Sequence, residues 1–293
     1  MQSQEVEVLI IGAGPAGIAA ALQLKRAGFD PFIVEKDRIG GALLNAGWVE
    51  NYPGFARGIS GLDLAKLFQE HLEELDIQVQ HAHADDLHRM DDHFIASINN
   101  KEVIARTVIV AAGTTPNQLD IHGVEDLSGK KVFTELRNLP ESLAGTACII
   151  GGGDAAFDYA LSLAWRKMDV IIAMRSASPC CLRILDERVL SMSDIKRIYN
   201  AEPVAITREK SQVVVNFRGG TPSPICADLV LCAVGRHPEL AFLSPELKNK
   251  PEIPQFHFIG DVVNGSCRQV GIAVGDGLRC AMEITQFLQE NNQ

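Results

Sequence analysis

The sequence predicts an α/β protein in which a second domain is inserted into a first domain of the same type. Three observations predict it. A strand that runs through a glycine-rich turn into a helix occurs twice, once from residue 7 and once from residue 146. Each copy is followed by a hairpin and by a strand that ends in Ala-x-Gly-x-x-Pro, at residues 111–116 and 233–238. A last strand and helix follow the second copy and complete the first domain.

Length and composition agree with this architecture. The 293 residues suffice for two domains of about 150 residues each. A net charge of −10 argues against nucleic acid or an anionic membrane as partner. The longest apolar run, 8–22, is short for a membrane span and contains glycine and proline. The first five residues lack the positive charge that opens a secretory signal, so we expect a cytoplasmic protein.

The first copy supplies the context that a dinucleotide-binding turn requires. An apolar strand at 7–11 precedes the turn, and a helix at 18–27 follows it and ends at Gly28. A second strand at 31–34 leads into Glu35. This order of strand, glycine turn, helix, strand and acid predicts a bound dinucleotide.

Each glycine of this turn has its own task. Gly12 makes the tight turn, Gly14 lets the backbone approach a pyrophosphate, and Gly17 permits close packing of helix on strand. The helix N-terminus then offers free N–H groups to the phosphates. Glu35 follows Gly12 by 23 residues and can accept hydrogen bonds from an adenosine ribose.

A helix and a polar hairpin are predicted next. Apolar residues at helical spacing over 62–75 predict an amphipathic helix. The following stretch is rich in histidine and aspartate, namely His81, His83, His88, His93, Asp85, Asp86, Asp91 and Asp92. Their spacing fits no defined metal site, so we expect no metal and a solvated hairpin edge.

The second copy repeats the pattern with one change. Strands at 146–150 and 169–173 flank a turn with Gly151, Gly153 and Ala156 at the three small-residue positions. The helix is expected at 157–167. Where the first copy has its acid, the second has Met174 followed by Arg175. An arginine without the acid favours NADP over NAD, and NADPH is therefore expected rather than NADH.

The last segment contributes to the first domain. A strand at 256–259 leads into Gly260-Asp261, and Arg268-Gln269 opens a helix that runs to about residue 289. An aspartate at this place can bind the polyol chain of a flavin. A helix N-terminus aimed at the pyrimidine edge would stabilise the charge of reduced flavin. The two copies thus predict a flavin and a nicotinamide held by one chain.

Over nearly its full length the chain resembles the low-molecular-weight thioredoxin reductases, which are FAD- and NAD(P)H-dependent flavoproteins. Glu50-Asn51-Tyr52-Pro53-Gly54 and Gly260-Asp261-Val262 carry the resemblance, together with both glycine turns. The resemblance implies two Rossmann-like, three-layer ββα/βαβ domains. The FAD-binding domain would comprise 1–121 and 241–293, and the NAD(P)-binding domain 122–240.

The resemblance also implies the binding residues. For FAD they are Gly12, Gly14, Pro15, Ala16, Gly17, Glu35, Lys36, Gly41, Asn51, Gly113, Gly260, Asp261, Arg268, Gln269 and Val270. For NAD(P) they are Gly151, Gly153, Asp154, Ala155, Ala156, Arg175 and Gly235.

The chain departs from the family at its redox centre. Thioredoxin reductases carry Cys-x-x-Cys shortly before the second glycine turn, in the stretch that here spans 130–140, yet no cysteine occurs between Met1 and Ala147. The Gln that usually follows Gly40-Gly41 is Ala42. Of the family's NADP motif His-Arg-Arg-x-x-x-Arg, only Arg175 remains.

The cysteines that are present fall elsewhere. The sequence has seven, an odd number at irregular spacings, and we expect reduced thiols. Cys180-Cys181 follows the nucleotide-binding strand of the second copy, and Cys267 adjoins Arg268. A redox role for these three cysteines is the less favoured interpretation, and inert thiols are the favoured one.

Three functions stay open. The first is an NAD(P)H oxidoreductase without a redox dithiol, which passes electrons through FAD to a ferredoxin- or flavodoxin-like carrier or to a small acceptor. The run Gly151–Leu161 resembles thioredoxin reductase-type ferredoxin–NADP reductases, which also lack Cys-x-x-Cys but usually extend beyond the last helix, whereas this chain stops at Gln293. The second is a thioredoxin or disulfide reductase that uses other cysteines. The third is a flavin-binding regulatory or partner subunit.

The resemblance to the thioredoxin reductase family also implies that the protein forms a homodimer.

Overall fold

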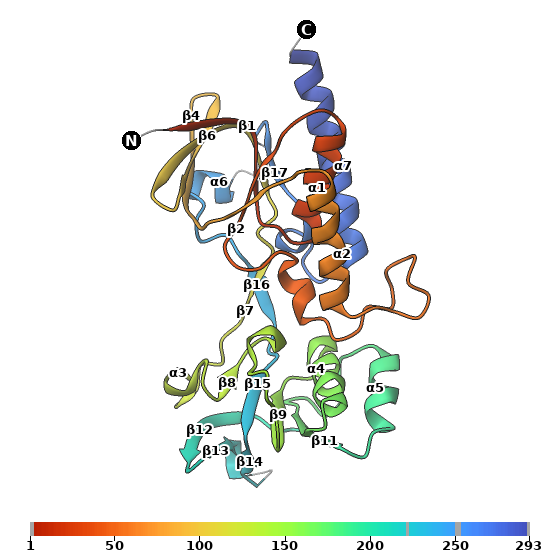
Figure 1. Cartoon of the computed structure of the whole chain (residues 1–293). Helices are drawn as coiled ribbons and strands as arrows, with labels where there is room; N and C mark the ends of the chain where they lie inside the picture. Colours follow the sequence, from red (N-terminus) through yellow and green to blue (C-terminus); the bar gives the residue numbers. More distant parts are fainter. Residues whose placement is uncertain (1–2, 221–222, 250–252, 292–293) are drawn as a thin grey trace. The chain divides into compact units, whose positions relative to one another are not determined.

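The computed structural model describes residues 3–220, 223–249 and 253–291, and the chain divides into two compact units (Figure 1). Unit 1 comprises 1–44, 49–115 and 237–293, and unit 2 comprises 45–48 and 116–236. The second unit is thus an insertion in the first. These bounds lie a few residues before the boundaries expected at 121 and 240, and they assign 45–48 to unit 2.

Unit 1 is built on a seven-stranded mixed sheet with the order β3-β2-β1-β6-β5-β4, in which β17 also pairs with β6. The strands are β1 (Gln4–Ile11), β2 (Phe32–Glu35), β3 (Val79–His81), β4 (Ala84–Met90), β5 (His93–Ile98), β6 (Lys101–Val110) and β17 (Phe256–Phe258). The long strand β6 pairs with β1 along the whole length of β1. Its other edge pairs with β5 over the first half and with β17 over the second.

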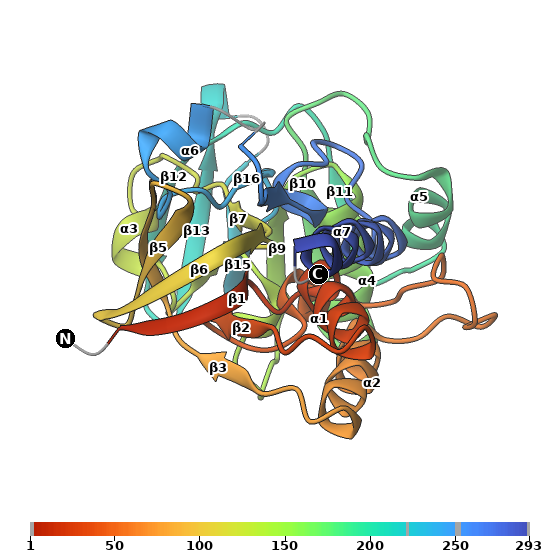
Figure 2. The same ribbon diagram turned by 90° about the horizontal axis from the view of Figure 1, so that it is seen from above.

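Helices cover one face of this sheet. They are α1 (Pro15–Arg26), α2 (Gly61–Glu74) and α7 (Val270–Asn291), and α6 (Pro245–Asn249) lies near β4. Figure 2 shows α1 and α7 side by side next to β1 and β2. Alternate residues of β1 enter different cores, because successive side chains of a strand point to opposite faces. Val8 and Ile10 pack with the helices, whereas Leu9 and Ile11 pack with β5, β6 and β17.

Unit 2 has a five-stranded parallel sheet, β11-β10-β9-β15-β8, and a separate three-stranded antiparallel sheet, β12-β13-β14. The first sheet contains β8 (Val132–Phe133), β9 (Thr146–Ile150), β10 (Asp169–Ala173), β11 (Ile195–Ile198) and β15 (Leu229–Cys232). The second contains β12 (Pro203–Glu209), β13 (Gln212–Phe217) and β14 (Ile225–Ala227). The helices are α3 (Val124–Leu127), α4 (Asp154–Trp165) and α5 (Arg183–Leu190).

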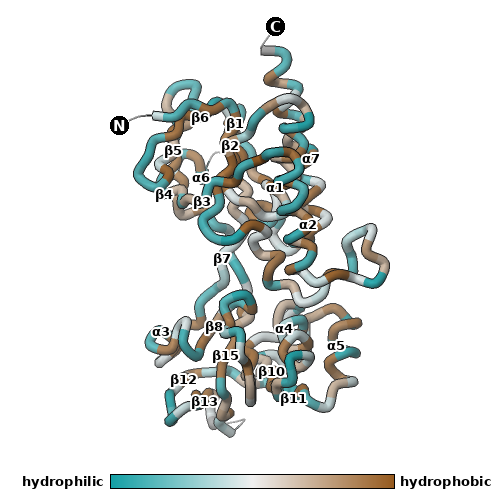
Figure 3. The backbone as a smooth tube through the Cα atoms, in the orientation of Figure 1, coloured by the Kyte–Doolittle hydropathy of each residue, from teal (hydrophilic) through white to brown (hydrophobic). Residues whose placement is uncertain are grey.

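The layers of unit 2 follow the same rule as those of unit 1. Ala147 and Ile149 of β9 pack with α4, whereas Cys148 and Ile150 pack with the antiparallel sheet. Both faces of β9 are therefore buried, as the near-continuous apolar run predicts. In unit 1, β1 and β2 are likewise coloured as hydrophobic in Figure 3. Two short strands, β7 (Thr114–Pro116) and β16 (Arg236–Pro238), pair where the chain passes between the units.

The predicted fold class is confirmed. Strands β9 and β10 have the predicted bounds 146–150 and 169–173. Helices α1 and α4 begin at Pro15 and Asp154, three residues before the predicted starts at 18 and 157, because proline and aspartate suit the first helical turn. In the described part of the chain, no helix is long and apolar enough to cross a membrane.

Candidate dinucleotide-binding sites

The glycine turn of unit 1 lies between β1 and α1. Gly12 has φ = 109°, and a Cβ there would lie 2.3 Å from the Ala111 carbonyl oxygen. A Cβ on Gly17 would lie 1.9 Å from the Gly12 oxygen. These two glycines are required by the packing of the protein itself. A Cβ on Gly14, by contrast, would meet no protein atom within 4 Å. The open space at Gly14 is where a bound pyrophosphate would pass, so the turn fits a dinucleotide.

The turn of unit 2, between β9 and α4, has the same geometry. Gly151 has φ = 149°, and its Cβ would lie 2.3 Å from the Ala233 carbonyl oxygen. A Cβ on Gly153 would meet nothing within 4 Å. Ala156 stands where unit 1 has Gly17 and is fully buried. The two turns therefore match at the first two positions and differ at the third, where unit 2 accommodates a methyl group.

Both helices that follow these turns begin without a side-chain cap. The N-cap residues are Gly14 for α1 and Gly153 for α4, and neither provides a capping hydrogen bond. Helix α2 differs, because the Ser60 hydroxyl accepts a hydrogen bond from the Asp63 N–H at 3.0 Å. A helix start that no side chain caps leaves its N–H groups available to a phosphate.

The acid at the end of β2 lies against the glycine turn. Glu35 accepts hydrogen bonds from the Ala13 N–H at 2.8 Å and from the Asp37 N–H at 2.9 Å. The adjacent Lys36 pairs with the Glu239 carboxylate, Nζ to Oε2 2.9 Å, and Glu239 also accepts from the Thr115 hydroxyl at 2.6 Å. Burial raises the pKa of Glu239, but these two donors outweigh it and the pKa is lowered. Lys36 is thus committed to Glu239.

Several other residues expected to bind FAD converge on the start of α1. Gly41 approaches Gly14, since a Cβ on Gly41 would lie 3.3 Å from the Gly14 Cα. A Cβ on Gly260 would lie 2.8 Å from that of Ala16. Asp261 belongs to the short helix η4 (Gly260–Val262), one residue beyond this contact.

The remaining predicted FAD residues lie nearby in unit 1. Asn51 donates its side-chain amide to the Gln269 carbonyl oxygen at 2.7 Å, so two of them are in direct contact. Val270 begins α7, immediately after Arg268 and Gln269. The Gly113 carbonyl accepts from the Glu239 N–H at 3.1 Å.

One residue that holds this region was not predicted. Asp276 of α7 accepts hydrogen bonds from the Gly260 N–H at 3.2 Å and from the Asn264 side chain at 2.6 Å. It thereby ties the loop around Asp261 to the last helix. No sequence motif indicates this, because the partners are brought together only by the turn of the chain between η4 and α7.

In unit 2, the end of β10 carries a buried apolar residue where β2 has its acid. Met174 is fully buried, and its side chain packs at Gly152. Arg175 follows and is exposed. Nearby, Arg218 makes two hydrogen bonds to Glu202, 2.7 and 3.0 Å, which lower the pKa of that carboxyl, and the charge of Arg175 adds to this effect. Arg175 therefore lies close to a carboxylate.

The other predicted NAD(P) residues lie around this turn. Asp154 and Ala155 form the exposed first turn of α4, and Asp154 accepts from the Leu182 N–H at 2.7 Å. Gly235 follows β15, and its carbonyl accepts from the Asn117 N–H at 2.9 Å.

The adjacent cysteines lie beside the second glycine turn as free thiols. The Cys180 N–H and Sγ both lie within hydrogen-bond distance of the Gly152 oxygen, at 2.8 and 3.2 Å. Burial, with Asp186 and Asp154 nearby, raises the pKa of Cys181 to about 11. At neutral pH this thiol is protonated, whereas disulfide exchange requires the thiolate. Cys267 is exposed and free.

The stretch 130–140 contains a buried ion network. Glu135, whose side chain is 4% exposed, pairs with Arg137 and Arg236, each at 2.9 Å. It also accepts from the Asn45 side chain at 3.1 Å. Burial alone would raise the pKa of Glu135, but the two guanidinium groups reverse that effect and lower it. The hydrogen bonds of Asn45, and of the Gly47 N–H to Asp158 at 2.7 Å, explain why 45–48 belongs to unit 2.

The histidine-rich hairpin forms pairs rather than a cluster. Nδ1 of His83 lies 3.0 Å from Asp85, and Nδ1 of His88 lies 2.7 Å from Asp86. Among the described residues, no group of three or more His, Cys, Asp or Glu side chains could hold a metal ion.

Comparison with known proteins agrees with this geometry. The chain is 26% identical to the thioredoxin reductase of Bacillus subtilis (strain 168) over 301 residues, 97% of this chain and 95% of the relative. It is 28% identical to the longer bifunctional thioredoxin reductase/thioredoxin of Mycobacterium leprae, of which it spans 66%. The crystal structure of Lactococcus lactis thioredoxin reductase superimposes with a TM-score of 0.88 at 27% identity, over 97% of this chain and 99% of that one.

The family model for pyridine nucleotide-disulphide oxidoreductases matches residues 6–277. This range contains both glycine turns, η4 and the start of α7. The protein therefore belongs to the pyridine nucleotide-disulphide oxidoreductase family and is of the thioredoxin reductase type.

Proposed function

We propose that the protein is an FAD-dependent NAD(P)H oxidoreductase that works without a redox dithiol. FAD would bind at Gly12–Gly17 of unit 1 and the pyridine nucleotide at Gly151–Ala156 of unit 2. The observation that carries the proposal is the pair of turns in which the middle glycine, Gly14 or Gly153, borders open space. Packing within the protein does not require these two glycines, whereas a phosphate chain does.

The residues of the chain have binding and orienting tasks in this proposal. The α1 and α4 N-termini would hold the two pyrophosphates, and Glu35 would hold the adenosine ribose of FAD. Asp261 would bind the flavin side chain, and Asp276 holds its loop through Gly260 and Asn264. Bound FAD supplies the redox chemistry, which is hydride uptake from the nicotinamide and electron release to an acceptor.

The electron acceptor is proposed to be a ferredoxin- or flavodoxin-like carrier or a small molecule. The relatives are named thioredoxin reductases. Here the stretch 130–140 has no cysteine and contains the Glu135 ion network in its place. A buried ion network cannot exchange with a disulfide, so this stretch supports an acceptor other than thioredoxin.

Anaerobic titration tests the central claim. The flavin absorbance near 450 nm should bleach on addition of NADPH, and more slowly with NADH because Arg175 is the one basic residue left of the NADP motif. Oxidised ferredoxin, flavodoxin or a quinone should then restore the absorbance. Bound FAD that neither nucleotide reduces would favour a flavin-binding partner subunit instead.

A second titration tests the disulfide alternative. The triple variant Cys180→Ser/Cys181→Ser/Cys267→Ser should react with NADPH and with the acceptor at the wild-type rate. The protonated state of Cys181 supports this expectation. Loss of turnover with a disulfide substrate in this variant, after such turnover in the wild type, would instead establish a reductase with non-standard cysteines.

The family resemblance also supports a homodimer. Size-exclusion chromatography with light scattering should give a mass of about twice the 31.8 kDa of one chain.

A further inference from the structure

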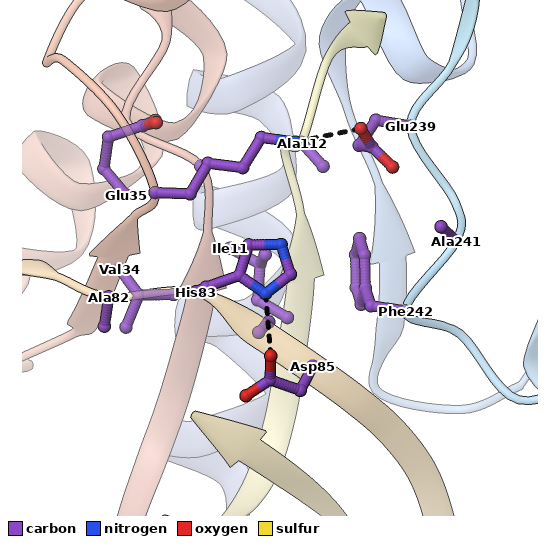
Figure 4. Close-up of a pocket in the computed structure, with 13 residues that line it drawn as sticks. Ile11, Val34, Glu35, Ala82, His83, Asp85, Ala112, Glu239, Ala241 and Phe242 are labelled. Carbon is purple, nitrogen blue, oxygen red and sulfur yellow. Dashed lines mark hydrogen bonds and ion pairs between the residues drawn. The ribbon is translucent and has the colours of Figure 1, made fainter. Parts of the chain in front are cut away.

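A cavity of unit 1 extends beyond Glu35 and away from the glycine turn. Its volume is about 170 Å³ (Figure 4). Gly12 and Glu35 line it near the turn. Residues 82–85, which run from the end of β3 into the start of β4, and Phe242 line the rest. The cavity thus continues from the proposed ribose position to a region lined by an imidazole and a phenyl ring.

The imidazole of His83 has one side-chain partner, Asp85. Its Nδ1 lies 3.0 Å from the Asp85 Oδ1. A carboxylate only accepts hydrogen bonds, so Nδ1 donates, and in the neutral ring Nε2 is left as an acceptor. Figure 4 shows the ring projecting between the Glu35 side and the Phe242 side of the cavity, with this second nitrogen turned away from Asp85.

The proposed function, on which this inference rests, gives the order in which the parts of FAD would follow one another along the cavity. In that function the pyrophosphate would lie at the α1 N-terminus and the ribose at Glu35. The base attached to that ribose would then lie in the part of the cavity lined by His83 and Phe242. We infer that His83, oriented by Asp85, recognises adenine by accepting a hydrogen bond from its exocyclic amine.

The chemistry of the base makes this recognition selective. Adenine carries an amine donor at C6, whereas hypoxanthine carries a carbonyl acceptor there. A ring nitrogen that only accepts binds the first and repels the second. The nearby Glu239 carboxylate is already engaged by Lys36 and Thr115, at 2.9 and 2.6 Å.

A second pair on the same hairpin provides a matched control. Nδ1 of His88 lies 2.7 Å from Asp86, so it has the same kind of partner as His83. The side chain of His88 is 46% exposed and that of His83 56%. His83 and Asp85 line the cavity, and His88 is not among its lining residues. If only exposure and the pairing with aspartate mattered, replacing either histidine would have the same effect on FAD binding. If His83 recognises adenine, only its replacement changes that binding.

The test is the affinity of flavin-depleted protein for FAD and for its deaminated analogue, which carries hypoxanthine. Binding is followed by flavin fluorescence at pH 8.5. The wild type should bind FAD about tenfold more tightly than the analogue. FAD forms one hydrogen bond with His83, whereas the analogue places an acceptor against an acceptor. His83→Phe should reduce that preference to near unity, and His83→Gln, whose carbonyl can accept, should restore part of it. His88→Phe should keep the full preference.

Each outcome decides one claim. Wild-type preference in His83→Phe, or equal affinity of the wild-type protein for the two flavins, would overturn the role of His83. Unchanged preference in Asp85→Ala would overturn orientation by Asp85. Failure of the wild type to bind either flavin would instead overturn the proposed function, so the two failures are distinguishable.

Discussion

The carboxylate of Asp276 accepts a hydrogen bond from the side-chain amide of Asn264 at 2.6 Å. A second hydrogen bond, from the Gly260 N–H at 3.2 Å, reaches the same oxygen. Asp276 lies in the first turns of α7 and is 17% exposed. The contact therefore links the helix to both ends of the loop that presents Asp261.

Replacement of Asp276 by alanine should loosen this loop. A hydrogen bond to a charged group contributes about 1.5–3 kcal/mol, and the two share one oxygen of a partly buried carboxylate, so we expect a loss of about 2 kcal/mol in the free energy of unfolding. The affinity for FAD should fall as well. Urea denaturation and flavin retention on gel filtration measure the two effects. Glu283→Gln, at an exposed carboxylate of the same helix, is the control and should change neither. Full FAD retention in Asp276→Ala would show that the loop needs no support from α7.

The glycine turn of unit 1 allows stability and binding to be separated. Gly14→Ala should keep or raise the free energy of unfolding by up to about 1 kcal/mol, since φ is −79° and a Cβ meets open space. The variant should nevertheless fail to retain FAD. Gly12→Ala should cost about 2–4 kcal/mol, because its φ is 109° and its Cβ would overlap the Ala111 oxygen. Thermal denaturation and the flavin absorbance of purified protein give both readings. Normal flavin content in Gly14→Ala would move the FAD site elsewhere.

The local pattern of the sequence determines much of this architecture. Strands β9 and β10 are identified by short β-branched runs between turn signals, and their predicted bounds agree with the structure. The first glycines, Gly12 and Gly151, have the positive φ values expected of tight turns.

Contacts between distant residues could not be predicted from that pattern. The hydrogen bond of Asn45 to Glu135 joins residues 90 positions apart, and no local signal assigns 45–48 to unit 2. The His83 side chain is exposed, as expected for a solvated edge. Its place beside Phe242 in the cavity could not be predicted, because the two residues are far apart in the sequence. The contacts of Asp276 with Gly260 and Asn264 likewise depend on the tertiary structure.

The glycine turn of unit 2 predicts a selective loss of nucleotide use. Gly153 has φ = −95° and open space at its Cβ position, so Gly153→Ala should fold with the wild-type melting temperature. It should keep its FAD, because the FAD site lies in unit 1. Reduction of the flavin by NADPH should become slow and should not saturate, whereas reduction by dithionite stays complete. Stopped-flow absorbance measures the first rate. A wild-type rate in this variant would place the nucleotide at another site.

The Glu135 network predicts a pH-dependent contribution to stability. Because Arg137 and Arg236 lower the pKa of Glu135 below its ordinary value, the carboxylate stabilises the folded state above that ordinary value, about 4.3. This contribution is lost as the pH falls through the lowered pKa of the folded state. At pH 7, Glu135→Gln should therefore cost about 3 kcal/mol, since it removes the buried carboxylate that pairs with both guanidinium groups. Urea denaturation should show this difference shrinking below about pH 4. Glu141→Gln, at an exposed position, should show no such difference at either pH. A constant loss across this range would mean that Glu135 acts through packing rather than through its charge.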